Sequence, residues 1–291
     1  MTSATRARRP VAIVGLGCIG GSLARALTAQ GVDVRGWSTS TSDRELAAEA
    51  GIRVAGGASP LAELCEGTTS VVLAVPFGRI AEVASAVLEV ALPPTRIFHV
   101  GGLQRREALG TDEATWHGVV GTHPLSGSHD HGFAASRANM FVGATVCIED
   151  RLDLRGRRAA EWLWRTAGAH RIDYRPAPDH DRLMAWVSHL PQLTATALAH
   201  TMAAADVAPA STGSGARDTT RLAATPLGAW PLLLRGAPDE LRAALTQLEA
   251  AIATLRRTLD AGDEKELAAI WERAMNWRRE AAGGNGGERR A

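Results

Sequence analysis

A glycine-rich turn close to the N-terminus has the spacing needed to hold a phosphorylated cofactor. The apolar segment Val11–Val14 is followed directly by Gly-Leu-Gly-Cys-Ile-Gly at Gly15–Gly20. In such a turn Gly15 allows a tight reversal, Gly17 lets a pyrophosphate approach the backbone, and Gly20 lets the next helix pack closely on the strand. The pyrophosphate would lie at the helix N-terminus, where free N–H groups and the helix dipole favour negative charge. Its place between a strand and a helix makes this spacing indicative of dinucleotide binding.

The next strand bears on which nicotinamide nucleotide binds. An NAD site has an acid about 20 residues beyond the first glycine, where it binds the ribose 2′-hydroxyl. Here the strand ends in hydroxyl side chains, at Ser38 and Thr39, with no carboxylate. Arg44 or Arg35 could instead accept a 2′-phosphate. We expect NADP or NAD, with NADP slightly favoured; the alternative is a solvated loop that tolerates either. The other residues assigned to the cofactor site are Cys18, Ile19, Val75 and Pro76.

Three later segments carry the polar residues of a candidate substrate pocket. They are Gly121–Gly127 (GTHPLSG), His180–Pro191 (HDRLMAWVSHLP) and Arg217–Ala223 (RDTTRLA). A neutral histidine such as His123 can accept a hydrogen bond from a substrate hydroxyl and then its proton, with a base titrating near pH 6–7. An arginine such as Arg221 can bind a carboxylate through two parallel hydrogen bonds. Taken alone, a histidine such as His123 before Pro124 is more often a structural turn residue, and Arg221 could instead pair with Asp218.

In this order, after the glycine-rich turn, the segments resemble the prephenate/arogenate dehydrogenases over about residues 11–260. The resemblance implies oxidative decarboxylation of a cyclohexadienol to an aromatic product, with a nicotinamide cofactor. It assigns the proton acceptor to His123, a second active-site histidine to His189, and the substrate carboxylate to Arg221. The other residues assigned to the substrate pocket are Arg217, Trp230 and Gly102. His189 could instead pack its helix, and Trp230 could belong to the core.

Four positions around this pocket depart from the family pattern. Gly102 replaces a serine that would contact the reacting hydroxyl, and Gln104 replaces a lysine. Leu232 and Ala237 stand where an acid and an amide are expected. We therefore expect either reduced activity or a substrate other than prephenate, such as arogenate. The arginine-rich composition is typical of organisms whose family members also use 4-amino-4-deoxyprephenate, which leaves the ring substituent open.

Two other functions are compatible with the sequence. A β-hydroxyacid dehydrogenase or imine reductase also joins a dinucleotide-binding domain to a helical dimer domain, but typically relies on a lysine there. The chain's one lysine, Lys265, lies far along the sequence from His189. A cofactor-binding homologue that has lost catalysis is the second alternative, because Gly102 and Gln104 replace active-site residues.

The elements that must position these residues follow an α/β pattern. Up to Tyr174 short β-rich runs alternate with helical stretches, which predicts a Rossmann-type, doubly wound parallel sheet. The predicted strands are Val11–Val14, Val32–Trp37, Ser70–Val75, Arg96–Val100, Gly118–Gly121, Ala144–Ile148 and His170–Tyr174. Beyond Pro176 alanine- and leucine-rich segments predict an all-α dimerisation domain. We expect a dinucleotide-binding domain over residues 1–175, a helical substrate and dimerisation domain over 176–282, and a disordered tail over 283–291.

Spacing and composition indicate the partners. An apolar seam from Leu241 to Leu259 predicts burial against a second copy in a homodimer. The net charge of +1 gives no bulk attraction for nucleic acid or anionic membranes. No apolar stretch is long enough to span a membrane, and the three cysteines lack metal-ligand spacing. We expect a cytoplasmic enzyme for a small carboxylate substrate, with no metal site.

Overall fold

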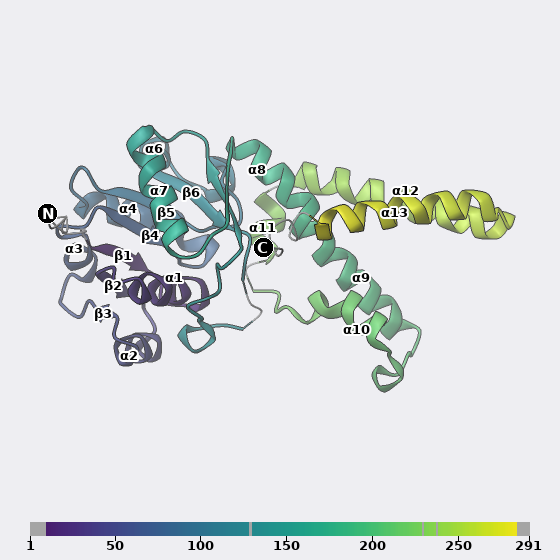
Figure 1. Cartoon of the computed structure of the whole chain (residues 1–291), viewed down its shortest axis with the longest axis horizontal. Helices are drawn as coiled ribbons and strands as arrows, with labels where there is room; N and C mark the ends of the chain where they lie inside the picture. The colour runs from purple at the N-terminus through teal and green to yellow at the C-terminus, as the bar shows by residue number, and fades with distance from the viewer. Residues whose placement is uncertain (1–9, 128–129, 229, 237, 284–291) are drawn as a thin grey trace, which may run out of the picture. The chain divides into compact units, whose positions relative to one another are not determined.

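The computed structural model describes residues 10–127, 130–228, 230–236 and 238–283. The chain divides into two compact units, residues 1–241 and 242–291 (Figure 1). The first contains the sheet and most of the helices, and the second contains two long helical segments. Of the predicted tail, residue 283 ends the last helix, and residues 284–291 lie outside the described residues.

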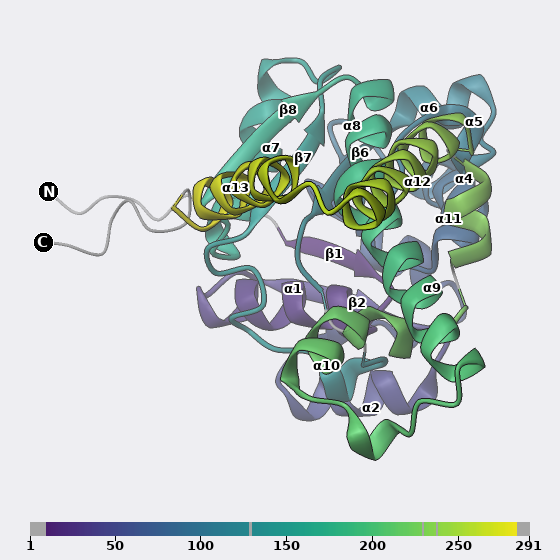
Figure 2. The ribbon, with the colours of Figure 1, turned by 90° about the vertical axis from the view of Figure 1, so that its right-hand side faces the viewer.

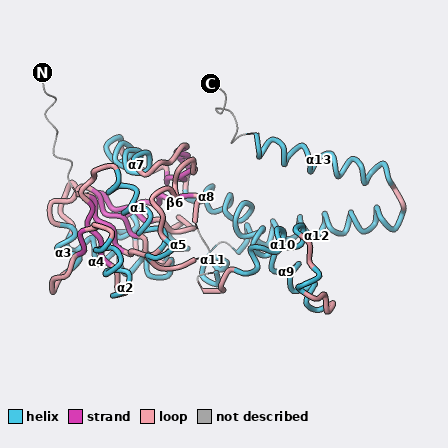
Figure 3. The backbone as a smooth tube through the Cα atoms, turned by 60° about the horizontal axis from the view of Figure 1, so that its bottom comes forward, coloured by secondary structure: helices cyan, strands magenta, loops and turns pink. Residues whose placement is uncertain are grey.

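The sheet has eight strands in the order β3-β2-β1-β4-β5-β6-β7-β8. Their bounds are β1 Val11–Val14, β2 Val34–Trp37, β3 Arg53–Val54, β4 Ser70–Leu73, β5 Arg96–His99, β6 Val119–Pro124, β7 Thr145–Glu149 and β8 Arg171–Arg175. Strand β1 pairs in parallel with both β2 and β4, so the strand order reverses there. Such a reversal opens a crevice at the carboxyl ends of the strands, where nucleotides bind. The predicted α/β fold is confirmed, and in Figure 3 the strands precede a purely helical part.

The far side of the sheet differs from the predicted all-parallel arrangement. Strands β6 and β7 pair antiparallel, with His123 opposite Cys147, while β8 runs parallel to β7. Within the described residues of the β6–β7 connection the regular structure is one 3₁₀ turn, η2 (Phe133–Ala135), rather than the α-helix that usually makes a parallel crossover. Strand β3 was not predicted because it is only two residues long.

Helices cover both faces of the sheet. Those of the sheet region are α1 Cys18–Ala29, α2 Thr41–Glu49, α3 Pro60–Cys65, α4 Ile80–Val90, α5 Arg106–Leu109, α6 Glu113–Gly118 and α7 Leu154–Thr166, with a 3₁₀ turn η1 at Phe77–Arg79. Successive strand residues point to opposite faces. Ile13 and Phe98 therefore belong to the core that includes α1 and α7 residues. Val14 and Ile97 belong to the other core, which includes α3 and α4 residues. The sheet is thus a rigid base for residues at its carboxyl edge.

After β8 the first unit is helical. Its elements are α8 Ala177–Met184, a π-helical turn η3 Ala185–His189, α9 Leu190–Ala204, 3₁₀ turns η4 Pro209–Ser211 and η5 Arg221–Ala224, α10 Ser214–Thr220 and α11 Trp230–Gly236. The π-helical turn lies just before Pro191, whose missing N–H and bulky ring disturb normal α-helical bonding to the preceding turn. Such turns are frequent at functional sites. Here it contains His189.

The last two helices are joined by a tight turn. They are α12 (Pro238–Ala261), which begins in the first unit, and α13 (Glu264–Gly283) (Figure 2). Gly262 has a φ of 63°, which favours glycine at a helix end. The side chain of Asp263 then accepts the N–H of Glu266 at 3.0 Å and caps α13. None of the described helices is both long and apolar enough to cross a membrane.

Candidate active site

The glycine-rich turn forms a cradle at the carboxyl end of β1. Gly15 has a φ of +98°, and a Cβ there would lie 2.5 Å from the Ala74 carbonyl oxygen. A Cβ at Gly20 would lie 1.9 Å from the carbonyl oxygen of Gly15. By contrast, a Cβ at Gly17 would have no atom within 4 Å. Two glycines are thus required by packing, while the third faces open space at the start of α1, where Cys18 and the next residues have N–H groups without intrahelical partners. This shape fits a pyrophosphate.

Arg44, in α2, places its guanidinium beside the end of β2, where a dinucleotide presents its adenosine ribose. Its guanidinium donates to the carbonyl of Ser38 at 2.5 Å and to the hydroxyl of Thr41 at 3.0 Å. Arg35 lies elsewhere, because its guanidinium donates to the carbonyls of Glu63 and Glu66 at the end of α3. Of the two arginines suggested by the sequence, Arg44 therefore borders the candidate ribose site.

The other predicted cofactor residues lie around the same cradle. Ile19 is in the first turn of α1, and Thr39 follows Ser38 at the exposed end of β2. Val75 and Pro76 follow β4, and the Val75 nitrogen would lie 2.9 Å from a Cβ at Gly15. The sheet thus brings these separate segments to one edge.

The β6–β7 connection, for which the sequence indicated no role, is hydrogen-bonded to the helices beside the glycine-rich turn. The side chain of Asp43 in α2 accepts the N–H of Phe133 at 2.8 Å, and Ser22 in α1 accepts the N–H of Arg137 at 2.9 Å. Arg25 also donates to Ser136 at 2.8 Å. These bonds connect residues about a hundred positions apart, so no local pattern signals them. They fix the β6–β7 connection against α1.

His123, half-buried near the end of β6, belongs to a chain of hydrogen bonds that leads into the interior. Its Nδ1 lies 3.1 Å from Nε2 of His180, and Nδ1 of His180 lies 2.8 Å from Oδ1 of Asp181. The side chains of His180 and Asp181 are fully buried. Both come from α8, in the segment singled out by the sequence, but neither was given a role there. The signal available was the adjacent His-Asp pair at the start of that segment.

The surroundings of His123 keep its imidazole neutral. Burial, followed by the neighbouring His180, His99 and His189, lowers the pKa of His123 to about 3. This value lies below the pH 6–7 expected from the sequence, because a sequence does not show how many other histidines pack around a site. A neutral His123 is a hydrogen-bond acceptor throughout the neutral pH range.

His189 and Trp230 lie together, as the predicted pocket requires. Their rings meet edge to face with centroids 6.0 Å apart. His189 is 2% exposed, and its Nδ1 has no hydrogen-bond partner among the residues that the structure describes. Burial lowers the pKa of His189 as well. An unpartnered buried nitrogen costs free energy unless a ligand satisfies it.

The predicted substrate arginines are exposed. Arg217 donates to the carbonyl of Thr212 at 2.6 Å, and Arg221 lies on the 3₁₀ turn η5. That turn is fastened to α9 by Gln192, whose side chain donates to the carbonyl of Leu222 at 2.9 Å. Among the described residues, neither arginine is hydrogen-bonded to the histidines of the site. The role of these two arginines in binding a substrate carboxylate therefore stays a prediction.

The two departures from the family pattern after β5 have different environments. Gly102 is partly exposed at the strand end. Gln104 is fully buried, donates from its side chain to the carbonyl of Cys147 at 3.2 Å, and has an unpartnered Oε1. The positive charge beside Asp181 comes from the next residue, Arg105, whose Nε lies 3.3 Å from that carboxylate. Gln104 is thus a core residue here.

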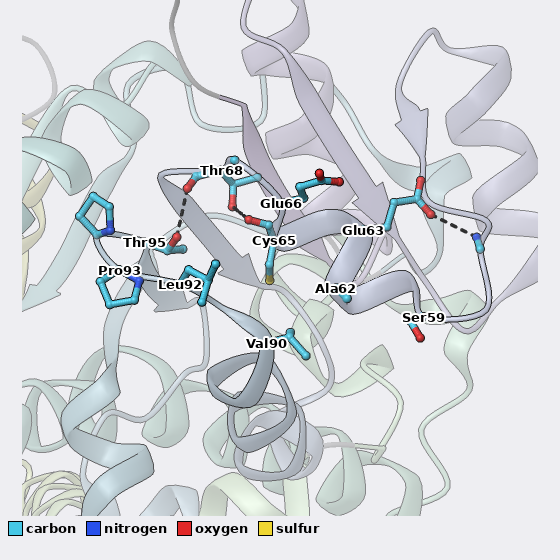
Figure 4. A pocket seen from close by; sticks show the side chains of 13 residues that line it. Ser59, Ala62, Glu63, Cys65, Glu66, Thr68, Val90, Leu92, Pro93 and Thr95 are labelled. Atoms are coloured by element: carbon cyan, nitrogen blue, oxygen red, sulfur yellow. Dashed lines mark hydrogen bonds between the residues drawn. The ribbon is translucent and has the colours of Figure 1, made fainter.

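A surface cavity of about 690 Å³ lies away from this edge (Figure 4). It is lined by residues that precede β4 and β5, including Thr68 and Thr95, which are joined by a 3.0 Å hydrogen bond. The amino ends of these strands are at the opposite edge of the sheet from His123. None of the predicted site residues lines this cavity.

Comparisons with known proteins agree with this geometry. Residues 23–164 match the model "Prephenate dehydrogenase, nucleotide-binding domain", and residues 176–273 match "Prephenate dehydrogenase, dimerization domain". Prephenate dehydrogenase of Bacillus subtilis is 25% identical over 282 residues, 92% of this chain and 75% of that protein. Cyclohexadienyl dehydrogenase of Zymomonas mobilis is 29% identical over 265 residues, 84% of this chain and 88% of that protein.

The fold is shared with a solved structure. The crystal structure of prephenate dehydrogenase from A. aeolicus, in complex with hydroxyphenyl propionate and NAD+, superposes with a TM-score of 0.84 at 22% identity, covering 95% of this chain and 99% of that one. Both parts of the chain match models of one family in the order that the sequence predicts. The chain therefore belongs to the prephenate dehydrogenase family, and it is an NAD(P)-dependent oxidoreductase that oxidatively decarboxylates a cyclohexadienyl substrate.

Proposed function

We propose that the protein converts prephenate, arogenate or 4-amino-4-deoxyprephenate to the aromatic product, with His123 as the acceptor of the substrate proton. The observation that carries this proposal is a neutral histidine at the carboxyl end of β6, on the same edge as the glycine-rich cradle. The nicotinamide, when bound, accepts hydride from the ring carbon that bears the hydroxyl. Loss of the ring carboxylate as carbon dioxide then makes the ring aromatic.

Each residue of the proposed site would have a separate role in binding or proton transfer. The backbone of Gly17, Cys18 and Ile19 holds the pyrophosphate. His123 takes the hydroxyl proton, which allows the C–O bond to gain double-bond character as hydride leaves. His189 and Trp230 form a wall of the ring pocket, and the unpartnered Nδ1 of His189 can hydrogen-bond a substrate oxygen. We keep residues 1–175 as the cofactor domain and 176–282 as the substrate and dimerisation domain in this proposal.

The cofactor of this proposal is NADP in preference to NAD. Support comes from the guanidinium of Arg44 beside Ser38, together with the hydroxyls of Thr39 and Thr41 at the same strand end. Guanidinium and hydroxyl groups suit a 2′-phosphate, whereas a ribose 2′-hydroxyl is usually bound by a carboxylate.

The substrate ring carries either a hydroxyl or an amine, and the site bears on which of the two it is. Gly102 supplies no hydroxyl beside the reacting carbon, so the site lacks a donor or acceptor that a hydroxyl-bearing ring would use. This favours testing the 4-amino compound beside the two hydroxyl compounds. Reduction of cofactor in a single-turnover absorbance assay with each compound identifies the best substrate, and a chain that binds cofactor but reduces none of them would be a non-catalytic homologue.

Replacing His123 tests the mechanism on whichever substrate is best. His123→Asn keeps a similar shape but cannot take a proton, so turnover should fall by roughly two to four orders of magnitude with little change in KM. His170→Asn, at an exposed histidine, is the matched control and should behave as wild type. Turnover of His123→Asn within threefold of wild type would remove His123 from the mechanism.

Replacing Arg221 tests substrate binding separately. Arg221→Ala should raise KM by an amount worth roughly 1.5–3 kcal/mol, the range for losing a hydrogen bond to a charged group. The exposed Arg171 offers a control, as Arg171→Ala. An unchanged KM for Arg221→Ala would mean that another group binds the carboxylate.

A further inference from the structure

The hydrogen-bond chain from Asp181 to His123 determines which nitrogen of His123 can act as a base. This inference deepens the proposed function, because it concerns how His123 works. The chain runs from Asp181 through His180 to Nδ1 of His123, which leaves Nε2 of His123 as the ring nitrogen outside the chain. The contact between His180 and Asp181 measures 2.8 Å, and the contact between His123 and His180 measures 3.1 Å.

Asp181 determines which ring nitrogen of His180 carries hydrogen. Its carboxylate accepts the backbone N–H groups of Gln104 at 2.8 Å and Arg105 at 3.1 Å, as well as the guanidinium of Arg105 at 3.3 Å. A carboxylate that accepts this many donors is ionised and has no proton to give. The 2.8 Å contact with His180 is therefore a hydrogen bond donated by Nδ1–H of His180.

The second proton follows from the first. In a neutral imidazole only one nitrogen carries hydrogen, so Nε2 of His180 is an acceptor. It accepts Nδ1–H of His123, and the outer Nε2 of His123 then has a free lone pair. If His180 carried a second proton, its Nε2–H would donate to His123 instead, and the outer Nε2 of His123 would bear hydrogen and could accept nothing.

We propose that His180 and Asp181 are positioning residues that keep Nε2 of His123 free to take the substrate proton, and that His123 passes its Nδ1 proton on to His180. The substrate O–H bond breaks as the Nε2–H bond forms, and the Nδ1–H bond of His123 breaks as the Nε2–H bond of His180 forms. The electron pair of the breaking C–H bond leaves with the hydride to the nicotinamide. The positive charge thus ends on His180, beside the Asp181 carboxylate.

The charges around the two rings favour this final arrangement. His123 is surrounded by other histidines, and burial together with those histidines disfavours a positive charge on it. His180 instead contacts a buried carboxylate directly. The titratable and charged groups that face these residues are His99 at the end of β5, His189 on η3, Arg105 before α5, and Glu149 and Arg151 around β7. His180 also orients His123 through its hydrogen bond, a role that a serine at position 102 would otherwise have.

Tautomer measurement on the free protein tests the chain without any substrate. In full-length protein labelled with ¹⁵N-histidine, two-bond ¹H–¹⁵N correlations at pH 7 show which ring nitrogen carries hydrogen. The signal lost in His123→Asn identifies His123, and the one lost in His180→Gln identifies His180. We expect both rings to be protonated on Nδ1. A His123 ring protonated on Nε2 would overturn the proposal.

Two variants at His180 separate the setting of the tautomer from the receipt of the proton. In His180→Gln the amide oxygen can still accept Nδ1–H of His123 but cannot take its proton. KM should then stay within threefold while kcat falls roughly ten- to a hundredfold, and the pH profile of kcat/KM should change. His180→Leu removes the acceptor altogether and should lower kcat further. His170→Gln is the exposed control.

The outcomes distinguish this inference from the proposed function. Wild-type kcat and an unchanged pH profile in His180→Gln would overturn the relay. If no cyclohexadienyl compound reduces the cofactor, the proposed function fails, and the tautomer of His123 alone then decides the inference. A His180→Leu chain that does not fold leaves the decision to His180→Gln and the wild-type tautomers.

Discussion

At the scale of single residues, the departures from the family pattern are accompanied by other groups in the structure. A sequence with Gly102 and Gln104 lacks a hydroxyl and an ammonium at these positions. In the fold, His180 contacts the candidate base, and Arg105 provides the positive charge beside Asp181. Loss of two polar residues from a motif is therefore not by itself a sign of an inactive site. Another residue can take their role if its side chain lies within contact distance of the same group.

The preference for NADP over NAD also depends on single side chains. Arg44→Ala removes the guanidinium at the end of β2 and should weaken NADPH binding about tenfold while leaving NADH binding nearly unchanged. Ser38→Asp should weaken NADPH binding and strengthen NADH binding, because a carboxylate repels the 2′-phosphate and binds the 2′-hydroxyl. Fluorescence titration with each cofactor measures both effects. Wild-type protein that binds NADH tenfold more tightly than NADPH would contradict this reading of the loop.

At the scale of elements, most candidate site residues before Tyr174 lie at or just beyond the carboxyl end of a strand. β1, β2, β4, β5 and β6 all run in parallel, so their carboxyl ends meet at one edge. The glycine-rich turn adds a helix whose first N–H groups face the space above Gly17. The cradle is therefore a property of backbone geometry, with few side chains needed.

Substitution of Gly17 tests the cradle. Gly17→Ala introduces a methyl group into space that is empty of protein atoms, at an ordinary negative φ, so folding should be unaffected. The same methyl group should obstruct the pyrophosphate and weaken cofactor binding at least tenfold. Gly213→Ala, at another glycine with open surroundings, is the matched control. Equal cofactor affinity in Gly17→Ala and wild type would place the pyrophosphate elsewhere.

The sequence predicts those elements whose signals are local. Seven strands and the glycine-rich turn follow from apolar runs and residue spacing, and all seven are present within a few residues of the predicted bounds. The antiparallel pairing of β7 and the π-helical turn at Ala185–His189 depend on chain connections and on Pro191, and periodicity did not indicate them. The contact of His123 with His180 joins residues 57 positions apart, so it required the fold.

At the scale of the whole molecule, the buried histidines make stability depend on pH. Burial is the largest cause that lowers the pKa of both His99 and His123 to about 3, from an ordinary value of 6.5. The unfolded chain therefore binds protons more readily between these values, so stability is full above pH 6.5 and falls as the pH drops. Glu149, whose pKa burial raises, acts in the opposite direction but is a single group.

Acid should accordingly destabilise the protein. Between pH 6.5 and pH 5 the buried His99 should reduce the free energy of unfolding by roughly 2 kcal/mol, and the half-buried His123 by less. Urea unfolding at both pH values measures this loss. His99→Gln should show a smaller loss than wild type, and the exposed His170→Gln should show the same loss. An unfolding free energy that does not change between pH 7 and pH 5 would mean that these histidines are not buried as neutral groups.

A homodimer is also predicted at this scale, through the helical domain that matches the family's dimerization model. Apolar side chains on the second unit are exposed in the single chain, with Trp271 at 60% and Ile252 at 57%. Sedimentation should give a dimer at micromolar concentration, and Trp271→Arg should weaken it, whereas the neighbouring Glu272→Arg should not. A wild-type monomer at that concentration would contradict the prediction.

The hydrogen-bond chain at His123 also has a consequence for the order in which the site is made. During synthesis the chain leaves the ribosome from its N-terminus, and N-terminal parts fold first. The cradle and His123 emerge before α8, which carries His180 and Asp181. A nascent chain that ends before α8 has the cofactor-binding turn and the base, but its base has no partner to fix its tautomer. The turn that would hold the cofactor is thus synthesised before the residues that complete the hydrogen-bond chain at His123.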